Sequence, residues 1–131
     1  MKKILTVILI LTVSVMAELQ WQTTIPAALE LAKKENKIVM VFVEGKECRW
    51  CKKMKHRTLS DEKVEKRLQA YTLVKVFQED KEGMKPLPNI QGVPTIFFMT
   101  PDKKVLEEVI GYFDVDDFIS YIDSVETKVK K

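Results

Sequence analysis

The feature that most constrains the fold is the run IVMVFV at residues 38–43. It is continuous, apolar and rich in β-branched residues, as expected of a strand covered on both faces of its sheet. A sheet with two covered faces needs helices on both sides. The run therefore predicts an α/β domain in which this strand is buried.

The segments around this run alternate between helical and extended patterns. A helix is expected after Thr24, a candidate cap that precedes Pro26 in the first turn. This order predicts a central mixed β-sheet flanked by helices on both faces, with its last two strands paired as a hairpin. The other expected elements are strands at 71–77, 94–100 and 105–111, helices through the cysteine segment, at 61–69 and at 114–128, and a polar loop at 78–92.

The first 17 residues have the pattern of a secretory signal peptide. Lys2 and Lys3 precede an uncharged apolar run at 4–16, which ends before Ala17, and the order positive, apolar, small is typical of such peptides. The run is shorter than the ~20 residues that a membrane-spanning helix needs. We therefore expect cleavage after Ala17 and export of residues 18–131 to the periplasm.

The exported part is nearly neutral and has the size of one domain. The whole chain carries a net charge of +3, and loss of Lys2 and Lys3 lowers this to +1. Such a charge gives no reason to expect nucleic acid or an anionic membrane as a partner. Residues 18–131 are enough for one compact domain with its own core, which we expect to be monomeric.

The two cysteines of the chain lie in EGKECRWCKKMK, residues 44–55. This segment follows the buried strand and opens a helix, where unpaired N–H groups and the positive end of the helix dipole gather. No Ser, Thr, Asp or Asn precedes Cys48, so its sulfur could cap the helix, where a thiolate is stabilised. A disulfide to Cys51 closes too short a loop to stabilise the fold much. The spacing therefore favours reversible exchange.

Other uses of the cysteines fit less well. Covalent haem attachment requires a histidine directly after the second cysteine, where this chain has Lys52. A structural zinc site needs about four ligands, and His56 is read as a surface or packing residue. A Cu(I)-binding module that adds Met54 or Met99 to the cysteines stays open, although both methionines fall at packing positions. No other metal and no cofactor is expected.

The chain resembles the thioredoxin-like superfamily, in particular small exported bacterial proteins related to the C-terminal domains of thiol:disulfide interchange proteins. The resemblance covers nearly all of residues 18–131. It rests on Cys48-Arg49-Trp50-Cys51 after a strand, VKVFQED, Gly92-Val93-Pro94-Thr95 before a strand, and VIGYFDVDDFISYI.

This resemblance implies roles for residues around the motif. Cys48 and Cys51 would be the catalytic pair, and Arg49 and Trp50 would help to set its reduction potential. In the family, the proline at the position of Pro94 is cis and lies against the sulfurs, beside backbone groups that pair with an extended substrate. The substrate groove would then comprise Val93, Pro94, Thr95, Gly111 and Tyr112.

Two positions depart from the family pattern. An aromatic residue often precedes the first cysteine, whereas this chain has Glu47, which opposes the stabilisation of a neighbouring thiolate. Many thioredoxins carry a proton-moving aspartate at the position of Phe42. Glu44 lies on the same strand face as Phe42 and could accept protons instead; the other reading is a solvated residue at the strand end.

The resemblance implies an exported thiol–disulfide oxidoreductase that acts on the thiols and disulfides of other proteins. We favour a reductase of periplasmic disulfides that exchanges electrons with a membrane-bound partner, because exported relatives of this branch often act reductively. The alternatives are an oxidase that donates disulfides and a non-enzymatic Cu(I)-binding module. The basic run from Lys46 to Arg57 could be a solvated helix face or could steer acidic partners.

Overall fold

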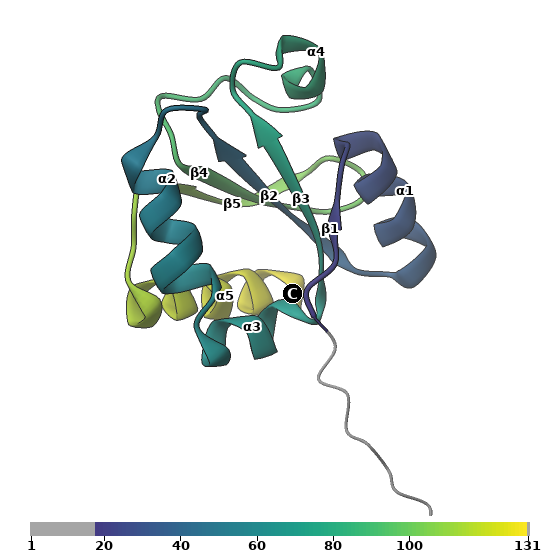
Figure 1. Cartoon of the computed structure of the whole chain (residues 1–131). Helices are drawn as coiled ribbons and strands as arrows, with labels where there is room; N and C mark the ends of the chain where they lie inside the picture. The colour runs from purple at the N-terminus through teal and green to yellow at the C-terminus, as the bar shows by residue number, and fades with distance from the viewer. Residues whose placement is uncertain (1–17, 131) are drawn as a thin grey trace, which may run out of the picture.

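The computed structural model describes residues 18–130 as one sheet between two layers of helices (Figure 1). The predicted signal peptide, residues 1–17, lies outside the described residues. The strands are β1 (Trp21–Gln22), β2 (Ile38–Glu44), β3 (Tyr71–Phe77), β4 (Thr95–Met99) and β5 (Val105–Ile110). The helices are α1 (Ile25–Glu35), α2 (Arg49–Lys53), the π-helix η1 (Met54–Leu59), α3 (Glu62–Leu68), α4 (Lys81–Met84) and α5 (Val115–Val129).

The predicted mixed sheet is confirmed, with strand order β1-β3-β2-β4-β5. β2 lies at its centre, parallel to β3 and antiparallel to β4, so that Val41 is opposite Val74 on one side and Phe97 on the other. β4 and β5 are antiparallel neighbours, as the predicted hairpin requires. The central position of β2 explains its unbroken apolar sequence, because both of its faces are covered.

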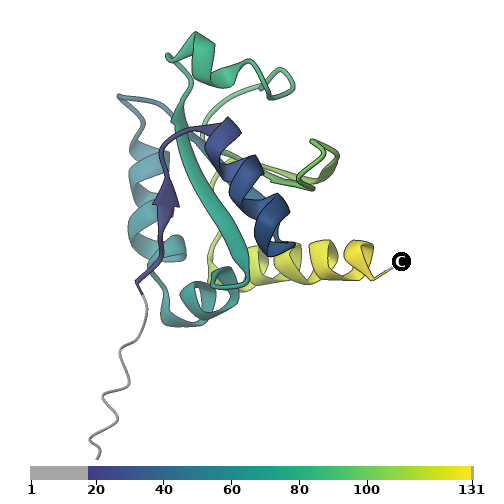
Figure 2. The ribbon, with the colours of Figure 1, turned by 90° about the vertical axis from the view of Figure 1, so that its right-hand side faces the viewer.

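Helices cover both faces of the sheet, and the alternation of side chains along β2 separates two cores. α1 lies on one side of the sheet, and α2 lies on the other (Figure 2). Val39, Val41 and Val43 pack with the buried residues of α1. Met40 and Phe42 point to the opposite face, where they join residues of η1, α3 and α5.

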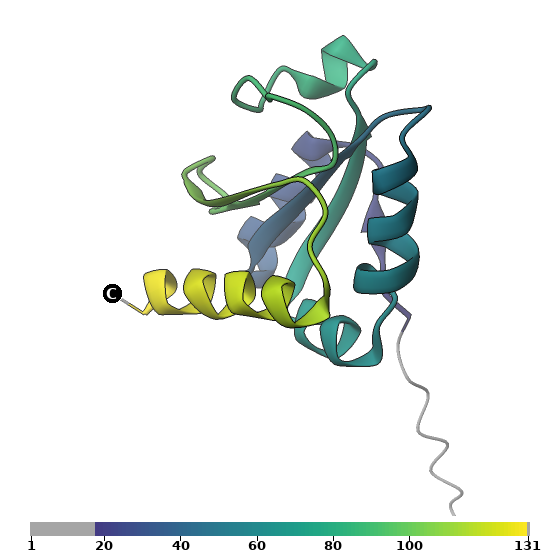
Figure 3. The same ribbon diagram turned by 90° about the vertical axis from the view of Figure 1, so that its left-hand side faces the viewer.

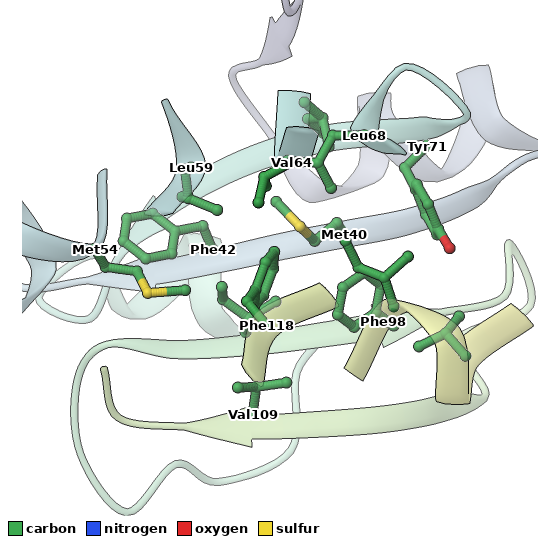
Figure 4. Packing of buried hydrophobic residues seen from close by; sticks show 14 of the residues in the cluster. Met40, Phe42, Met54, Leu59, Val64, Leu68, Tyr71, Phe98, Val109 and Phe118 are labelled. Atoms are coloured by element: carbon green, nitrogen blue, oxygen red, sulfur yellow. The ribbon is translucent and has the colours of Figure 1, made fainter. Parts of the chain in front are cut away.

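The second core is the larger cluster, and aromatic rings and methionines fill its centre (Figure 4). Phe118 of α5 is fully buried, and its ring centroid lies 6.2 Å from that of Phe98 on β4. Met54 belongs to this cluster, whereas Met99 belongs to the cluster under α1. The packing roles predicted for both methionines are confirmed.

Side-chain caps fix where the long helices begin. The N–H of Ala27 donates to Oγ1 of Thr24 over 3.3 Å, which confirms the predicted cap of α1. The α1 helix ends at Asn36, which adopts a left-handed conformation with φ of 54°. The N–H of Asp117 donates to the carboxylate of Asp114, which begins α5.

Three features differ from the sequence-based expectations. β1 has only two residues, which pair with Leu73 and Val74 of β3 rather than follow an apolar pattern. The expected loop at 78–92 contains the short helix α4, which is capped by Asp80. The helical segment after the cysteines changes from α to π at Met54, so it is not one uniform helix.

Figure 3 shows the segment between β5 and α5 running alongside α2, the cysteine helix, toward α3. None of the helices within residues 18–130 is both long enough and apolar enough to span a membrane. The arrangement leaves the start of α2, the segment before β4 and the segment after β5 near one another at one end of the central strands (Figure 1).

Candidate functional site

Cys48 and Cys51 form a disulfide at the start of α2, after the turn that follows β2. Their Cα atoms are 5.2 Å apart. Cys48 is the N-cap of α2 in an extended conformation, and its Sγ accepts a hydrogen bond from the N–H of Cys51 over 3.1 Å. The predicted capping role of the Cys48 sulfur is thereby confirmed.

The two cysteines differ in their exposure. Cys51 is only 1% exposed and belongs to the large core, whereas Cys48 is partly buried at its edge. A sulfur of another molecule can therefore approach Cys48 but not Cys51. This asymmetry is what a two-step exchange requires, in which one cysteine meets the partner and the other reacts afterwards from within.

Gly45 lets the cysteine turn lie against the segment before β4. A Cβ atom added at Gly45 would lie 3.3 Å from Cγ2 of Val93 and 3.4 Å from Cβ of Cys48. The contact with Val93 is tighter than most Cβ contacts, so a side chain here would push the segment before β4 away. The glycine thus brings Val93, which is distant in sequence, next to Cys48.

The Val93–Pro94 peptide bond is cis. Pro94 and Thr95 are buried, and the Thr95 hydroxyl donates to the carbonyl of Gly92 over 2.7 Å. The carbonyl of Pro94 accepts from the N–H of Gly111 over 2.8 Å. The second bond brings Gly111, which follows β5, beside Pro94, which precedes β4, and burial places Thr95 beneath the surface rather than on it.

The backbone of Val93 is open to a partner. Between residues 18 and 130, no main-chain hydrogen bond outside the helices and strands involves Val93. A main-chain N–H and C=O without partners in the protein can pair with an extended chain of another molecule. The main-chain groups of Val93 are therefore available beside Cys48.

An aromatic pair with a lysine stands next to the disulfide. Trp50 is 52% exposed, and its ring centroid lies 5.8 Å from that of Tyr112. The ammonium group of Lys53 lies 4.8 Å from the Trp50 centroid and 4.7 Å from the Tyr112 centroid. Both distances fit cation–π contacts. The sequence analysis placed Trp50 and Tyr112 here, and included Lys53 only as part of the basic run from Lys46 to Arg57.

A buried hydrogen bond attaches the Tyr112 segment to the cysteine helix. Thr58 of η1 is fully buried, and its hydroxyl donates to the carbonyl of Phe113 over 2.6 Å. Phe113 follows Tyr112 directly, so this bond restricts how far the Tyr112 ring can move from Trp50. The π-helical turn places the Thr58 hydroxyl at this point, and π-helical turns are frequent at functional sites.

Glu44 is buried at the end of β2. Its side chain is 6% exposed, and Oε1 accepts a hydrogen bond from Nζ of Lys55 over 2.6 Å. The reading of Glu44 as a solvated residue is therefore wrong. A buried carboxylate needs such a partner, and Lys55 lies one helical turn beyond Cys51.

Glu79 is a further residue that the sequence analysis missed. Its carboxylate accepts from the N–H of Lys46 over 3.1 Å and so holds the turn that leads into Cys48. This hydrogen bond is the largest cause that lowers the pKa of Glu79 below its usual value. Only the closure of the fold brings Glu79 to this turn, 33 residues away in the chain.

The residues around the cysteines offer few further metal ligands. Within residues 18–130, no cluster of three or more His, Cys, Asp or Glu side chains could hold a metal ion. His56 is exposed, in agreement with its reading as a surface residue. Met99 lies in the core under α1, so it cannot join Cys48 and Cys51 on the other face as a Cu(I) ligand.

Comparison with known proteins agrees with this geometry. A family model described as a thioredoxin-like domain matches residues 25–126. No curated protein matches the sequence. A thioredoxin from Thermus thermophilus is 26% identical with a TM-score of 0.73, over 86% of this chain and 90% of that one.

Two further solved structures are similar in fold. A DsbH oxidoreductase is 24% identical with a TM-score of 0.68, over 83% of this chain and 85% of that one. The reduced C-terminal domain of DsbD from Neisseria meningitidis is 24% identical with a TM-score of 0.64, over 74% of this chain and 90% of that one.

Proposed function

This chain belongs to the thioredoxin-like domain family, and on that premise we propose that it is an exported thiol–disulfide oxidoreductase that reduces disulfides of other proteins. The observation that carries the proposal is the unequal pair at the start of α2. Cys48 caps the helix and is partly exposed, while Cys51 is buried behind it. A purely structural disulfide would not need one accessible sulfur.

The reaction begins with the reduced pair. The Cys48 thiolate attacks one sulfur of a client disulfide, a new bond forms between them, and the other client sulfur leaves as a thiolate that takes a proton. Cys51 then loses its proton and attacks Sγ of Cys48, which releases the second client thiol. The client gains two electrons and two protons, and Cys48 and Cys51 become the disulfide.

The helix start favours the Cys48 thiolate. The positive end of the dipole and the N–H of Cys51, which already points at Sγ, stabilise a negative charge there by about 1 kcal/mol. The charge of Arg49 acts in the same direction, and that of Glu47 opposes it.

Glu44 is the proposed acceptor of the Cys51 proton. It is buried on the face of β2 that carries Phe42, and Phe42 and Cys51 both belong to the large core. Lys55 opposes its charge from the cysteine helix. Replacement Glu44→Gln should alter the pH profile of client release from a mixed disulfide, and an unchanged profile would remove Glu44 from the mechanism.

The reductive direction and the export rest on other support. The chain is 26% identical to a thioredoxin over most of both chains, and residues 1–17 have the pattern of a signal peptide. A reductase needs a two-electron dithiol donor to reduce Cys48 and Cys51 again, and for an exported protein that donor would be membrane-bound. Expression of the full chain in a Gram-negative host should give a periplasmic protein that begins at Glu18.

Cysteine variants test the reaction directly. A Cys51→Ala protein should accumulate a mixed disulfide with a client, because nothing remains to resolve it, and mass spectrometry without reductant would detect the adduct. A Cys48→Ala protein is the matched control and should form no adduct, because Cys51 is buried. Disulfide exchange at the normal rate by Cys48→Ala would overturn the assignment.

A further inference from the structure

We propose that Trp50, Lys53 and Tyr112, named here the basic aromatic rim, bind an acidic side chain next to the reactive cysteine of a client. The proposal rests on the function proposed above and specifies which clients the site prefers. The occupant is an extended protein segment with a carboxylate directly beside its cysteine. The rim would recognise that carboxylate while Val93 pairs with the backbone.

The charge of the domain is concentrated around the cysteines. Residues 44–57 contain six basic side chains and two carboxylates, a net charge of +4, whereas the rest of residues 18–131 has a net charge of −3. A patch of one sign on an otherwise oppositely charged surface attracts a partner of complementary charge to that place. The attraction points to an acidic partner at the cysteines.

The basic side chains of this segment are largely available to a partner. In the described part of the chain, Lys55 is the one residue of 44–57 whose basic group forms a salt bridge within 4.0 Å, and its partner is Glu44. Lys53 lies over two aromatic rings instead of beside a carboxylate. Glu47 is exposed in the same segment, so discrimination must come from the position of Lys53 and not from a uniformly basic surface.

The rim is ordered before a client arrives. Lys53 is held at two rings, and those rings come from α2 and from the segment after β5. The hydrogen bond from Thr58 to Phe113 fixes the second segment against the cysteine helix. A lysine that is already ordered loses less side-chain entropy when it binds a carboxylate, so more of the interaction remains as affinity.

The rim also lies where a client residue beside the cysteine must pass. Gly45 allows Val93 to lie next to Cys48, and the bond between Pro94 and Gly111 brings Tyr112 to the same end of the central strands. A client sulfur bonded to Cys48, with its backbone along Val93, therefore has its neighbouring side chains near Trp50 or Tyr112. The exposed Trp50 ring would cover the apolar stem of a glutamate.

Synthetic clients test the preference. Three peptides would differ only in the residues on both sides of one cysteine, which are Glu, Gln or Lys, and each cysteine would be blocked as a mixed disulfide with 2-mercaptoethanol. Reduced protein would cleave each of them, and chromatography would give the rates. Rates with dithiothreitol, measured in parallel, correct for the intrinsic reactivity of each peptide.

We expect the Glu peptide to react about two- to fivefold faster than the Lys peptide after this correction, as for one exposed charge pair. The ratio should fall toward one in ~1 M salt, where charges are screened within about 3 Å. Lys53→Gln should lower the ratio, whereas Lys66→Gln, the same charge change at an exposed site on α3, should leave it unchanged.

Two failures are distinguishable. Equal corrected rates for the Glu and Lys peptides, with all peptides reduced, would overturn the acidic preference and leave the oxidoreductase intact. If no peptide is reduced by the protein, the proposed function fails and the preference fails with it. An equal loss of the ratio in Lys66→Gln would assign the effect to net charge and would also overturn the role of Lys53.

Discussion

The start of α2, beside the cysteines, and the contact between α3 and α5 use their charged side chains in opposite ways. At the α3–α5 end, Arg67 donates to Asp123 over 2.7 Å and forms a second ion pair with Glu126 over 3.0 Å. At the cysteine end, Lys53 lies over two rings. Charges that join two helices are neutralised within the fold, whereas the charge beside the disulfide is kept available.

The aromatic residues show the same contrast. Phe118 is fully buried at the centre of the large core, whereas Trp50 is half exposed beside Cys48. Burial of an aromatic side chain removes a large apolar area from water and stabilises the fold, and exposure of one does not. An exposed tryptophan at a reactive sulfur therefore indicates binding rather than stability.

The largest expected effect concerns Phe118. Phe118→Ala should lower the free energy of unfolding by about 3–5 kcal/mol, because it removes transfer energy and leaves a cavity. Trp50→Ala should lower that free energy by only about 1 kcal/mol, through its contacts with Tyr112 and Lys53, but should slow exchange with protein clients. Urea unfolding and client reduction check both. Equal destabilisation by the two variants would contradict the division between the two ends.

A smaller loss is expected at Thr58, which connects the two ends. Thr58→Val leaves the buried carbonyl of Phe113 without its donor and should cost about 1–3 kcal/mol. Because Tyr112 is then free to move, this variant should also react more slowly with clients, although it touches neither sulfur. Thr58→Ser keeps the hydroxyl and serves as the control. A loss of stability with unchanged client rates would show that the bond does not order the rim.

The Arg67 ion pairs should contribute less. Arg67→Met should lower the free energy of unfolding by up to about 1 kcal/mol at low salt, because both carboxylate partners are at the surface and are screened. Client reduction should not change. Lys53→Met should also cost about 1 kcal/mol or less, through its two ring contacts, but unlike Arg67→Met it should slow the reaction with acidic clients. Unfolding curves at low and high salt, together with client rates, would separate the role of Lys53 from that of Arg67.

The smallest expected effect is the pH dependence due to Glu79. Its pKa is lowered in the folded state, mainly by the hydrogen bond from the N–H of Lys46. The ionised carboxylate therefore adds stability above the ordinary pKa of a glutamate, and this contribution is lost as the pH falls through the lowered pKa. Glu79→Gln should flatten the stability profile slightly in that acidic range, whereas Glu108→Gln, at an exposed site on β5, should not.

Much of the fold could be predicted because apolar patterns set it locally. The strand at 71–77 has its predicted bounds, and β2 extends the predicted strand by one residue. The continuous run in β2 indicates burial on both faces, and the period of α5 marks the face that carries Phe118 and Ile122. Each of these signals lies within a single segment of the sequence.

What could not be predicted depends on partners that are distant in the chain. β1 exists through its pairing with β3, and Glu79 reaches Lys46 only after the sheet has formed. The contact of Lys53 with Trp50 follows from local spacing, since Trp50 lies three residues earlier on the same helix. Its second ring, that of Tyr112, comes from the segment after β5. No local pattern predicts the π-helical turn at 54–59.

The candidate site shows the same division. The capping role of Cys48 followed from the absence of another capping residue, and it is confirmed. For Glu44, the sequence left burial and solvation equally open, because its partner Lys55 lies on the following helix. Local sequence therefore located the sulfur that caps α2, whereas the packing of distant segments determines its surroundings.

The most direct test of the account is the reduction potential of Cys48 and Cys51 in residues 18–131, measured by equilibration with glutathione buffers. We predict a reversible two-electron equilibrium near the thioredoxin value of about −270 mV, as expected of an electron donor. A value near about −120 mV would contradict the reductive direction. Failure of the pair to form a disulfide under any buffer would contradict the redox function itself.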